Sequence, residues 1–120
     1  GQRQRSAIIQ QLIASEHFLL LDEPFSGLDP KAKRNACDML RTVSLTHEHN
    51  TQIIVTHDID CAVELADTII ILGKEDNKPG STIVKTYNLI ERGVAWVPDV
   101  RHTKAFKDTV EEITDLFQTL

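Results

Sequence analysis

The sequence has too little of several residue types to fit some common protein classes. Aromatic residues make up only 5% of the 120 residues, which argues against a platform of stacked rings for nucleic-acid bases. The two cysteines, Cys37 and Cys61, are too few for a disulfide scaffold or a zinc site and suit a reducing compartment. No apolar run approaches the roughly 20 residues that cross a bilayer, and the polar opening GQRQRS is not a signal peptide.

The remaining composition is that of a globular domain. Hydrophobic residues make up 41% and charged residues 26% of the chain, which argues against disorder. The formal net charge of −5 disfavours a general role in binding polyanions, so we expect no nucleic-acid partner. A chain of 120 residues suits one domain and is long enough to bury a core.

Short apolar runs alternate with segments of helical periodicity. The runs at 18–21 and 52–56 are continuous, brief and followed by polar residues, so we expect two buried strands. Asp29 before Pro30 is a favourable helix start, with Asp29 as the N-cap. Two later runs, joined by the turn-rich GKEDNKPGS, predict a hairpin. The predicted helices span about 3–15, 30–46 and 58–66, and the predicted strands span 18–21, 52–56, 68–72 and 81–87.

The last segment predicts an amphipathic helix. Phe106, Val110, Ile113 and Phe117 recur on one stripe with acidic residues off it, so we expect this helix to pack back on the domain. The alternation of strands and helices predicts an α/β fold. We expect a mainly parallel sheet with flanking helices, an antiparallel hairpin at its edge and the C-terminal helix.

Three polar side chains directly follow the two predicted parallel strands. Asp22 and Glu23 end the first strand and His57 ends the second, and the carboxyl ends of parallel strands meet at one edge of a sheet. Mg²⁺ takes oxygen ligands such as carboxylates. A second carboxylate can orient or deprotonate water, and an imidazole can hydrogen-bond a phosphate. Taken singly, each residue is more often a solvent-facing strand end or a structural histidine.

Five motifs occur in a fixed order along the chain. Gly1-Gln2 resembles the last two residues of an LSGGQ signature, and Leu19–Asp22 resembles a Walker B strand. Glu23 resembles a catalytic glutamate, Ser26–Asp29 a D-loop, and His57 a switch histidine. Together they resemble the C-terminal half of the nucleotide-binding subunit of ATP-binding cassette (ABC) transporters. The resemblance runs from the first residue to about residue 89.

The resemblance implies a fold and a mechanism. The family has a P-loop NTPase-like fold, binds ATP with Mg²⁺ and hydrolyses the ATP. By similarity, Asp22 helps to hold Mg²⁺, Glu23 polarises the attacking water and His57 contacts the γ-phosphate. This division suits phosphoryl transfer, which depends on positioning and charge neutralisation more than on covalent chemistry.

The resemblance also implies partners and a location. Two nucleotide-binding domains sandwich two ATP molecules, so Asp29 would act across the dimer, and Gly1 and Gln2 would belong to the partner's ATP site. The subunit would dock on transmembrane permease subunits as a peripheral protein at the cytoplasmic face of the membrane. The form FSGLDPKAKR is more similar to bacterial importers than to exporters. The alternatives are an ABC-type ATPase of translation or DNA repair, and a non-catalytic interaction module.

The P-loop, the start of the signature motif and the upstream part of the family's domain are missing. No G-x-x-x-x-G-K-[ST] P-loop occurs in the chain, which begins at Gly1, so we expect a fragment of a longer protein. In this interpretation, residues 1–92 are the C-terminal portion of a nucleotide-binding domain and residues 93–120 are an extension. We expect the isolated fragment to be inactive as an ATPase and to self-associate through an uncovered apolar face or strand edge.

Overall fold

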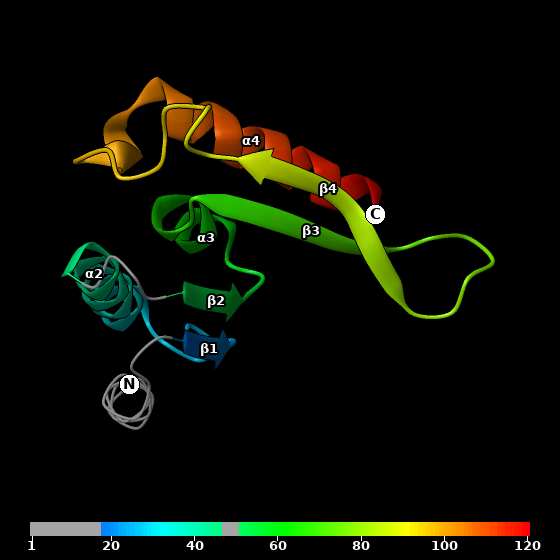
Figure 1. Cartoon of the computed structure of the whole chain (residues 1–120), viewed down its shortest axis with the longest axis horizontal. Coiled ribbons are helices and arrows are strands. Elements are labelled where there is room, and N and C mark those ends of the chain that lie inside the picture. The colour runs from blue at the N-terminus through cyan, green and yellow to red at the C-terminus, as the bar shows by residue number, and fades with distance from the viewer. Residues whose placement is uncertain (1–17, 47–50) are drawn as a thin grey trace. The chain divides into compact units, whose positions relative to one another are not determined.

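The structure is a computed structural model, and it describes residues 18–46 and 51–120 (Figure 1). The chain divides into two compact units, Gly1–Asp58 and Ile59–Leu120. The predicted helix at 3–15 lies outside the described residues. The described strands form a parallel pair in the first unit and an antiparallel pair in the second, so the fold is mixed α/β.

The sheet of the first unit consists of β1 (Phe18–Asp22) and β2 (Thr51–Val55). The strands are parallel, and their register places Asp22 opposite Val55. A parallel pair needs a crossover connection, and α2, described below, lies between the two strands in the chain. The pairing confirms the two predicted strands and their parallel direction.

The prediction that these two strands are buried is wrong for one face of the sheet. Leu19 and Leu21 are buried, with 4% and 6% exposure. The alternate side chains share the opposite face, because neighbouring residues of a strand point to opposite sides of the sheet. An apolar run shows that both faces are hydrophobic, but not whether a second layer covers each of them. The side chains of the open face are between 45% and 51% exposed: Phe18, Leu20, Ile53 and Val55.

The helix α2 (Pro30–Thr46) begins directly after the predicted capping residue. The backbone N of Ala32 donates to Oδ1 of Asp29 at 2.7 Å, which satisfies one of the amide groups left open at a helix N-terminus. Ala36 and Leu40, which share one face of the helix at i,i+4 spacing, are buried at 1% and 0% exposure. The cap and the buried face confirm the predicted helix.

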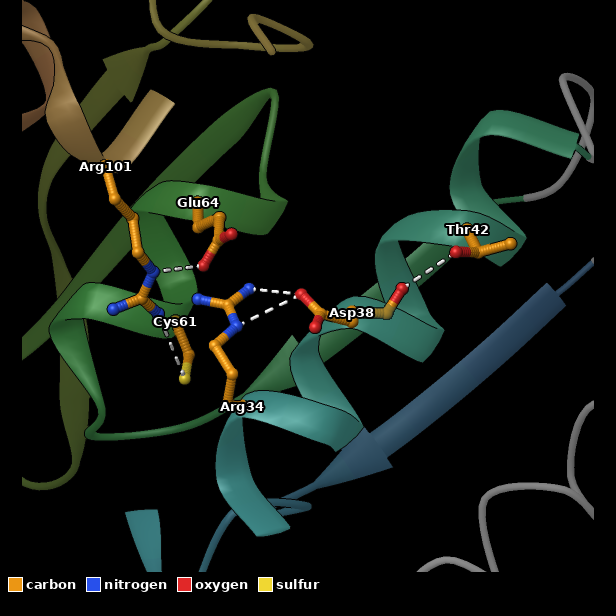
Figure 2. A network of polar contacts seen from close by, with 6 residues as sticks. All are labelled: Arg34, Asp38, Thr42, Cys61, Glu64 and Arg101. Atoms are coloured by element: carbon orange, nitrogen blue, oxygen red, sulfur yellow. Dashed lines mark hydrogen bonds and ion pairs between the residues drawn. The ribbon is translucent and has the colours of Figure 1, made fainter. Parts of the chain in front are cut away.

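Arg34, Asp38 and Thr42 form a polar network along α2 (Figure 2). Nε and Nη2 of Arg34 both donate to Oδ1 of Asp38, at 3.0 and 2.6 Å. The hydroxyl of Thr42 donates to the carbonyl O of Asp38 at 2.9 Å. An ion pair at this i,i+4 spacing stabilises a helix by roughly 0.3–0.5 kcal/mol, so the ion pair between Arg34 and Asp38 stabilises α2.

The second unit begins with α3 (Ile59–Leu65), which is followed by β3 (Thr68–Lys74) and β4 (Ser81–Asn88). β3 and β4 pair antiparallel, with a register irregularity between Ile71 and Leu72. This pairing confirms the hairpin that the short connector predicts. Among the described strands β3 and β4 form a two-stranded sheet of their own, and the expected place of the hairpin at the edge of a mainly parallel sheet stays a prediction.

A single 3-10 turn, η1 (Val100–His102), leads into the last helix, α4 (Lys104–Thr119). The hydroxyl of Thr103 accepts a hydrogen bond from the backbone N of Phe106 at 3.2 Å and so caps the helix. None of the helices that the structure describes is long and apolar enough to cross a membrane.

The second unit has a hydrophobic core to which all its elements contribute. Phe106 and Ile113 of the predicted stripe lie in it, which confirms that the C-terminal helix packs back, whereas Phe117 near the helix end is 40% exposed. Buried side chains that precede residue 92 and buried side chains that follow residue 93 belong to the same core. The expected domain boundary between residues 92 and 93 stays a prediction. The core residues are Val63, Ile69, Ile71, Tyr87, Leu89, Val94, Val100, Phe106 and Ile113.

An ion pair with a buried carboxylate and a partly exposed guanidinium joins α3 to η1. Nε of Arg101 donates to Oε2 of Glu64, whose side chain is only 5% exposed. Nη2 of Arg101 lies 3.9 Å from Sγ of Cys61 (Figure 2). Removing one member of a buried pair leaves the other charge in a low-dielectric setting, which is strongly destabilising. The pair therefore fixes η1 against α3.

Ionic contacts join α4 to β4 and to the loop after β4. Nη1 of Arg92 donates to Oε2 of Glu112 at 2.6 Å, and Nζ of Lys85 lies 3.6 Å from Oε1 of Glu112. The two cations also lie over the ring of Tyr87, at 5.0 Å for Lys85 and 4.9 Å for Arg92. The hydrogen bond from Arg92 lowers the pKa of Glu112, and the charges of Arg92 and Lys85 act in the same direction.

Candidate functional site

The β1–β2 sheet ends in polar residues at one edge. Asp22 lies opposite Val55 in the parallel register, and the backbone N of Glu23 donates to the carbonyl O of Val55 at 2.7 Å. The residues that follow the two strands are therefore neighbours, as expected at the carboxyl edge of parallel strands.

Glu23 and His57 are in direct contact at this edge. Nδ1 of His57 lies 2.9 Å from Oε1 of Glu23. The histidine side chain is 80% exposed and the glutamate side chain 36% exposed, but Oε2 of Glu23 is buried, so the imidazole is the part of the pair that is open to a ligand while each side chain orients the other. When Nδ1 of His57 carries a proton, this N–H group donates to the Glu23 carboxylate and favours one orientation of the imidazole ring. The structure thus brings these two side chains together, and their catalytic roles stay predictions.

The backbone of Glu23 is unusual for a residue other than glycine. Its φ of 49° lies in the left-handed region, where a non-glycine residue is strained by about 1–3 kcal/mol. Such strain persists only where the surroundings hold it, and here the hydrogen bond to Val55 and the contact with His57 do so. Because strained residues cluster at functional sites, the backbone identifies Glu23 as a candidate independently of any motif.

Asp22 ends β1 with an exposed side chain. In the part of the chain that the structure describes, no group of three or more His, Cys, Asp or Glu side chains is placed to hold a metal ion. Mg²⁺ usually keeps several waters and binds through one or two carboxylates together with substrate phosphates. An exposed carboxylate beside Glu23 fits such a partial set of ligands, and the assignment of Asp22 to Mg²⁺ stays a prediction.

The turn Ser26–Asp29 leads from β1 towards α2. Gly27 has a φ of 75°, which glycine adopts without a steric penalty. Asp29 is exposed, and its Oδ1 caps the helix of its own chain. Its action across a dimer stays a prediction. Gly1 and Gln2, the other two predicted nucleotide-binding residues, lie outside the described residues.

One contact next to the site has no signal in the sequence. Nζ of Lys33, in α2, lies 2.7 Å from Oδ2 of Asp58, the residue that follows His57. The sequence predicts Asp58 only as the start of a short helix and gives Lys33 no role. Local patterns reveal periodicity and capping, but an ion pair between two separate segments leaves no such pattern.

The fold and the site together define a class of protein. Two parallel strands with a connecting helix, and polar side chains gathered at their carboxyl edge, are compatible with part of a P-loop NTPase-like domain.

Known proteins of one kind are similar to this chain, although no protein-family profile matches it. It is 35% identical over 114 residues to Aliphatic sulfonates import ATP-binding protein SsuB 1 of Shouchella clausii, covering 94% of this chain and 41% of that protein. It is 36% identical over 122 residues to Uncharacterized ABC transporter ATP-binding protein YtlC of Bacillus subtilis, covering 100% of this chain and 42% of YtlC.

A third relative matches a shorter stretch more closely. Sulfate/thiosulfate import ATP-binding protein CysA of Acinetobacter baylyi is 46% identical over 76 residues, covering 62% of this chain and 21% of CysA. These relatives confirm the resemblance: the chain is homologous to ABC transporter ATP-binding proteins. It spans between 21% and 42% of the length of these three relatives.

Proposed function

We propose that this chain is part of the ATP-hydrolysing subunit of an ABC importer. The proposal is carried by the 2.9 Å contact between Glu23 and His57 at the carboxyl edge of two parallel strands. The relatives support the transport role over translation or DNA repair, because SsuB 1 and CysA are named import ATP-binding proteins. The paired acid and histidine favour a catalytic subunit over an interaction module.

In this proposal Glu23 acts on the water that attacks ATP. A carboxylate placed beside a water accepts its proton or orients it, which accelerates a reaction by about 10²–10⁴-fold. His57 holds Oε1 of Glu23 in place, and its exposed ring is accessible to hydrogen-bond the γ-phosphate. The two side chains thus supply positioning rather than covalent chemistry, as phosphoryl transfer requires.

Asp22 is the residue that would hold Mg²⁺. Its carboxylate is an oxygen donor of the kind that this cation prefers, and it directly precedes Glu23 at the same edge. Bound Mg²⁺ neutralises charge on the phosphates of ATP. Asp22 would therefore keep the cation next to the residue that acts on water.

A second nucleotide-binding domain would complete the ATP site. Asp29 would act across the dimer, and Gly1 and Gln2 would contact the ATP of the partner domain. The 120 residues contain no P-loop sequence, so we infer that this chain alone does not hydrolyse ATP. The complete subunit would bind permease partners at the cytoplasmic face of the membrane.

The test is ATP hydrolysis by the product of the intact gene, purified with its permease. Glu23→Gln keeps the shape of the side chain but removes its basicity, so kcat should fall by about 10²–10⁴-fold while ATP remains bound. Glu111→Gln is the matched control, because it makes the same change at an exposed position of α4. An unchanged kcat in Glu23→Gln would overturn the proposal.

A further inference from the structure

The ion pair between Lys33 and Asp58 lies beside the proposed site, but the mechanism above does not use it. Nζ of Lys33 lies 2.7 Å from Oδ2 of Asp58, and the side chains are 38% and 17% exposed. The pair is partly shielded from water, so solvent and salt weaken it less than they weaken a fully exposed pair. It joins α2 to the segment that follows β2, within the first unit.

At one end, the pair is anchored to the turn before α2. The backbone N of Lys33 donates to the carbonyl O of Asp29 at 2.9 Å. Oδ1 of Asp29 also accepts from the backbone N of Ala32 at 2.7 Å. These hydrogen bonds hold the turn and the start of the helix together. A displacement of Ser26–Asp29 therefore carries Lys33 with it.

At the other end, the pair is anchored beside the histidine. Asp58 directly follows His57, and its backbone N donates to the hydroxyl of Thr56 at 3.0 Å. This bond closes a local turn that includes His57. Nδ1 of His57 in turn lies 2.9 Å from Oε1 of Glu23. Holding Asp58 in place therefore restricts the positions that the imidazole can take.

We propose that Lys33 is a positioning residue that sets where His57 lies relative to Glu23. The inference rests on the proposed function, in which the turn Ser26–Asp29 meets a second nucleotide-binding domain. Lys33 then makes the geometry of the Glu23–His57 contact depend on the pairing of the two domains. The contacts that support this lie within one unit and join, in order, Asp29, Lys33, Asp58, His57 and Glu23.

The test observes the imidazole of His57 by NMR in protein labelled with ¹⁵N-histidine, with the resonances assigned through His57→Gln. Glu23→Gln provides the reference for a weakened contact. Lys33→Gln should move the His57 nitrogen resonances towards their positions in Glu23→Gln, and Lys33→Arg, which keeps the positive charge, should restore them. Lys31→Gln, the same change at an exposed lysine of α2, should leave them in place.

Asp58→Asn removes the carboxylate of the Lys33–Asp58 ion pair. This variant keeps the test decisive if a Lys33 variant folds poorly. It should shift the same resonances, and the double variant with Lys33→Gln should shift them little further, because both changes remove one interaction. Resonances that move in Glu23→Gln but in neither of these variants would overturn the inference and leave the proposed function standing. Resonances unmoved even by Glu23→Gln would overturn the Glu23–His57 contact and both proposals.

Discussion

Among single residues, Glu23 combines a strained backbone with the position closest to the proposed chemistry. Its φ of 49° is one that glycine adopts far more easily than any residue with a Cβ. Glycine would relieve the backbone but would remove the carboxylate that contacts His57. The presence of glutamate is therefore explained by its side chain and not by the stability of the turn.

Replacing Glu23 by glycine and by alanine separates these two effects. Both variants lose the carboxylate, but only alanine retains a Cβ in the left-handed conformation. Glu23→Gly should therefore be the more stable of the two, by about 1 kcal/mol. Urea denaturation of both variants measures this difference. Equal midpoints would show that the backbone at this position is not strained.

Among the elements, α4 is held by its apolar stripe and by charges at its surface. Glu112 accepts from Arg92 at 2.6 Å, and this hydrogen bond holds its pKa below the ordinary value of 4.5. A carboxyl group with a lowered pKa in the folded state stabilises the protein above its unfolded pKa. That stabilisation is lost as the pH falls through the folded value.

Glu112→Gln should consequently be less stable than the wild type at neutral pH. The groups are largely exposed, so the difference should be roughly 0.2–1 kcal/mol. It should shrink as the pH falls from the ordinary carboxyl pKa of 4.5 through the lower pKa of the folded state, below which the wild-type carboxyl is also neutral. Thermal unfolding across this pH range measures the effect, with Glu111→Gln as the control. A difference that stays constant into acid would rule out the ion pair as its source.

At the scale of the whole molecule, one face of the β1–β2 sheet is open to solvent, although Ile70, Leu72 and Ile83 of the β3–β4 pair are more exposed still, at 54% to 60%. Four large apolar side chains on the open face of the β1–β2 sheet are 45% to 51% exposed, and monomeric proteins rarely leave such a group uncovered. We therefore expect the isolated chain to self-associate through this face. The side chains concerned are Phe18, Leu20, Ile53 and Val55.

A charge on this face should oppose the association. Leu20→Lys places an ammonium group at a position that is 51% exposed, so the fold should tolerate it better than a charge in the core. Ile90→Lys is the matched control, because Ile90 is also 51% exposed but lies in neither sheet. Sedimentation over a concentration series should show association in the wild type and in Ile90→Lys, and less of it in Leu20→Lys. A wild type that remains monomeric at the highest concentration would contradict the expectation.

The described strands and helices could be predicted from the sequence because each depends on a local rule, and the meeting of Glu23 and His57 at one edge follows once the two strands are taken as parallel neighbours. Short apolar runs predict strands, Asp29 before Pro30 predicts a helix start, and parallel strands gather the residues that follow them. The sequence predicts an uncovered apolar face or strand edge, but which side chains form it, and the Lys33–Asp58 pair, could not be predicted, because both depend on which distant segments come together.

A double-mutant cycle of Glu23→Gln and His57→Ala on kcat of the intact gene product tests most directly whether the two side chains act together. Two side chains that act as one unit through the observed 2.9 Å contact should give non-additive losses. The double variant should be about as slow as the slower single variant. Losses that multiply would show that Glu23 and His57 act independently, and the proposed catalytic pair would be wrong.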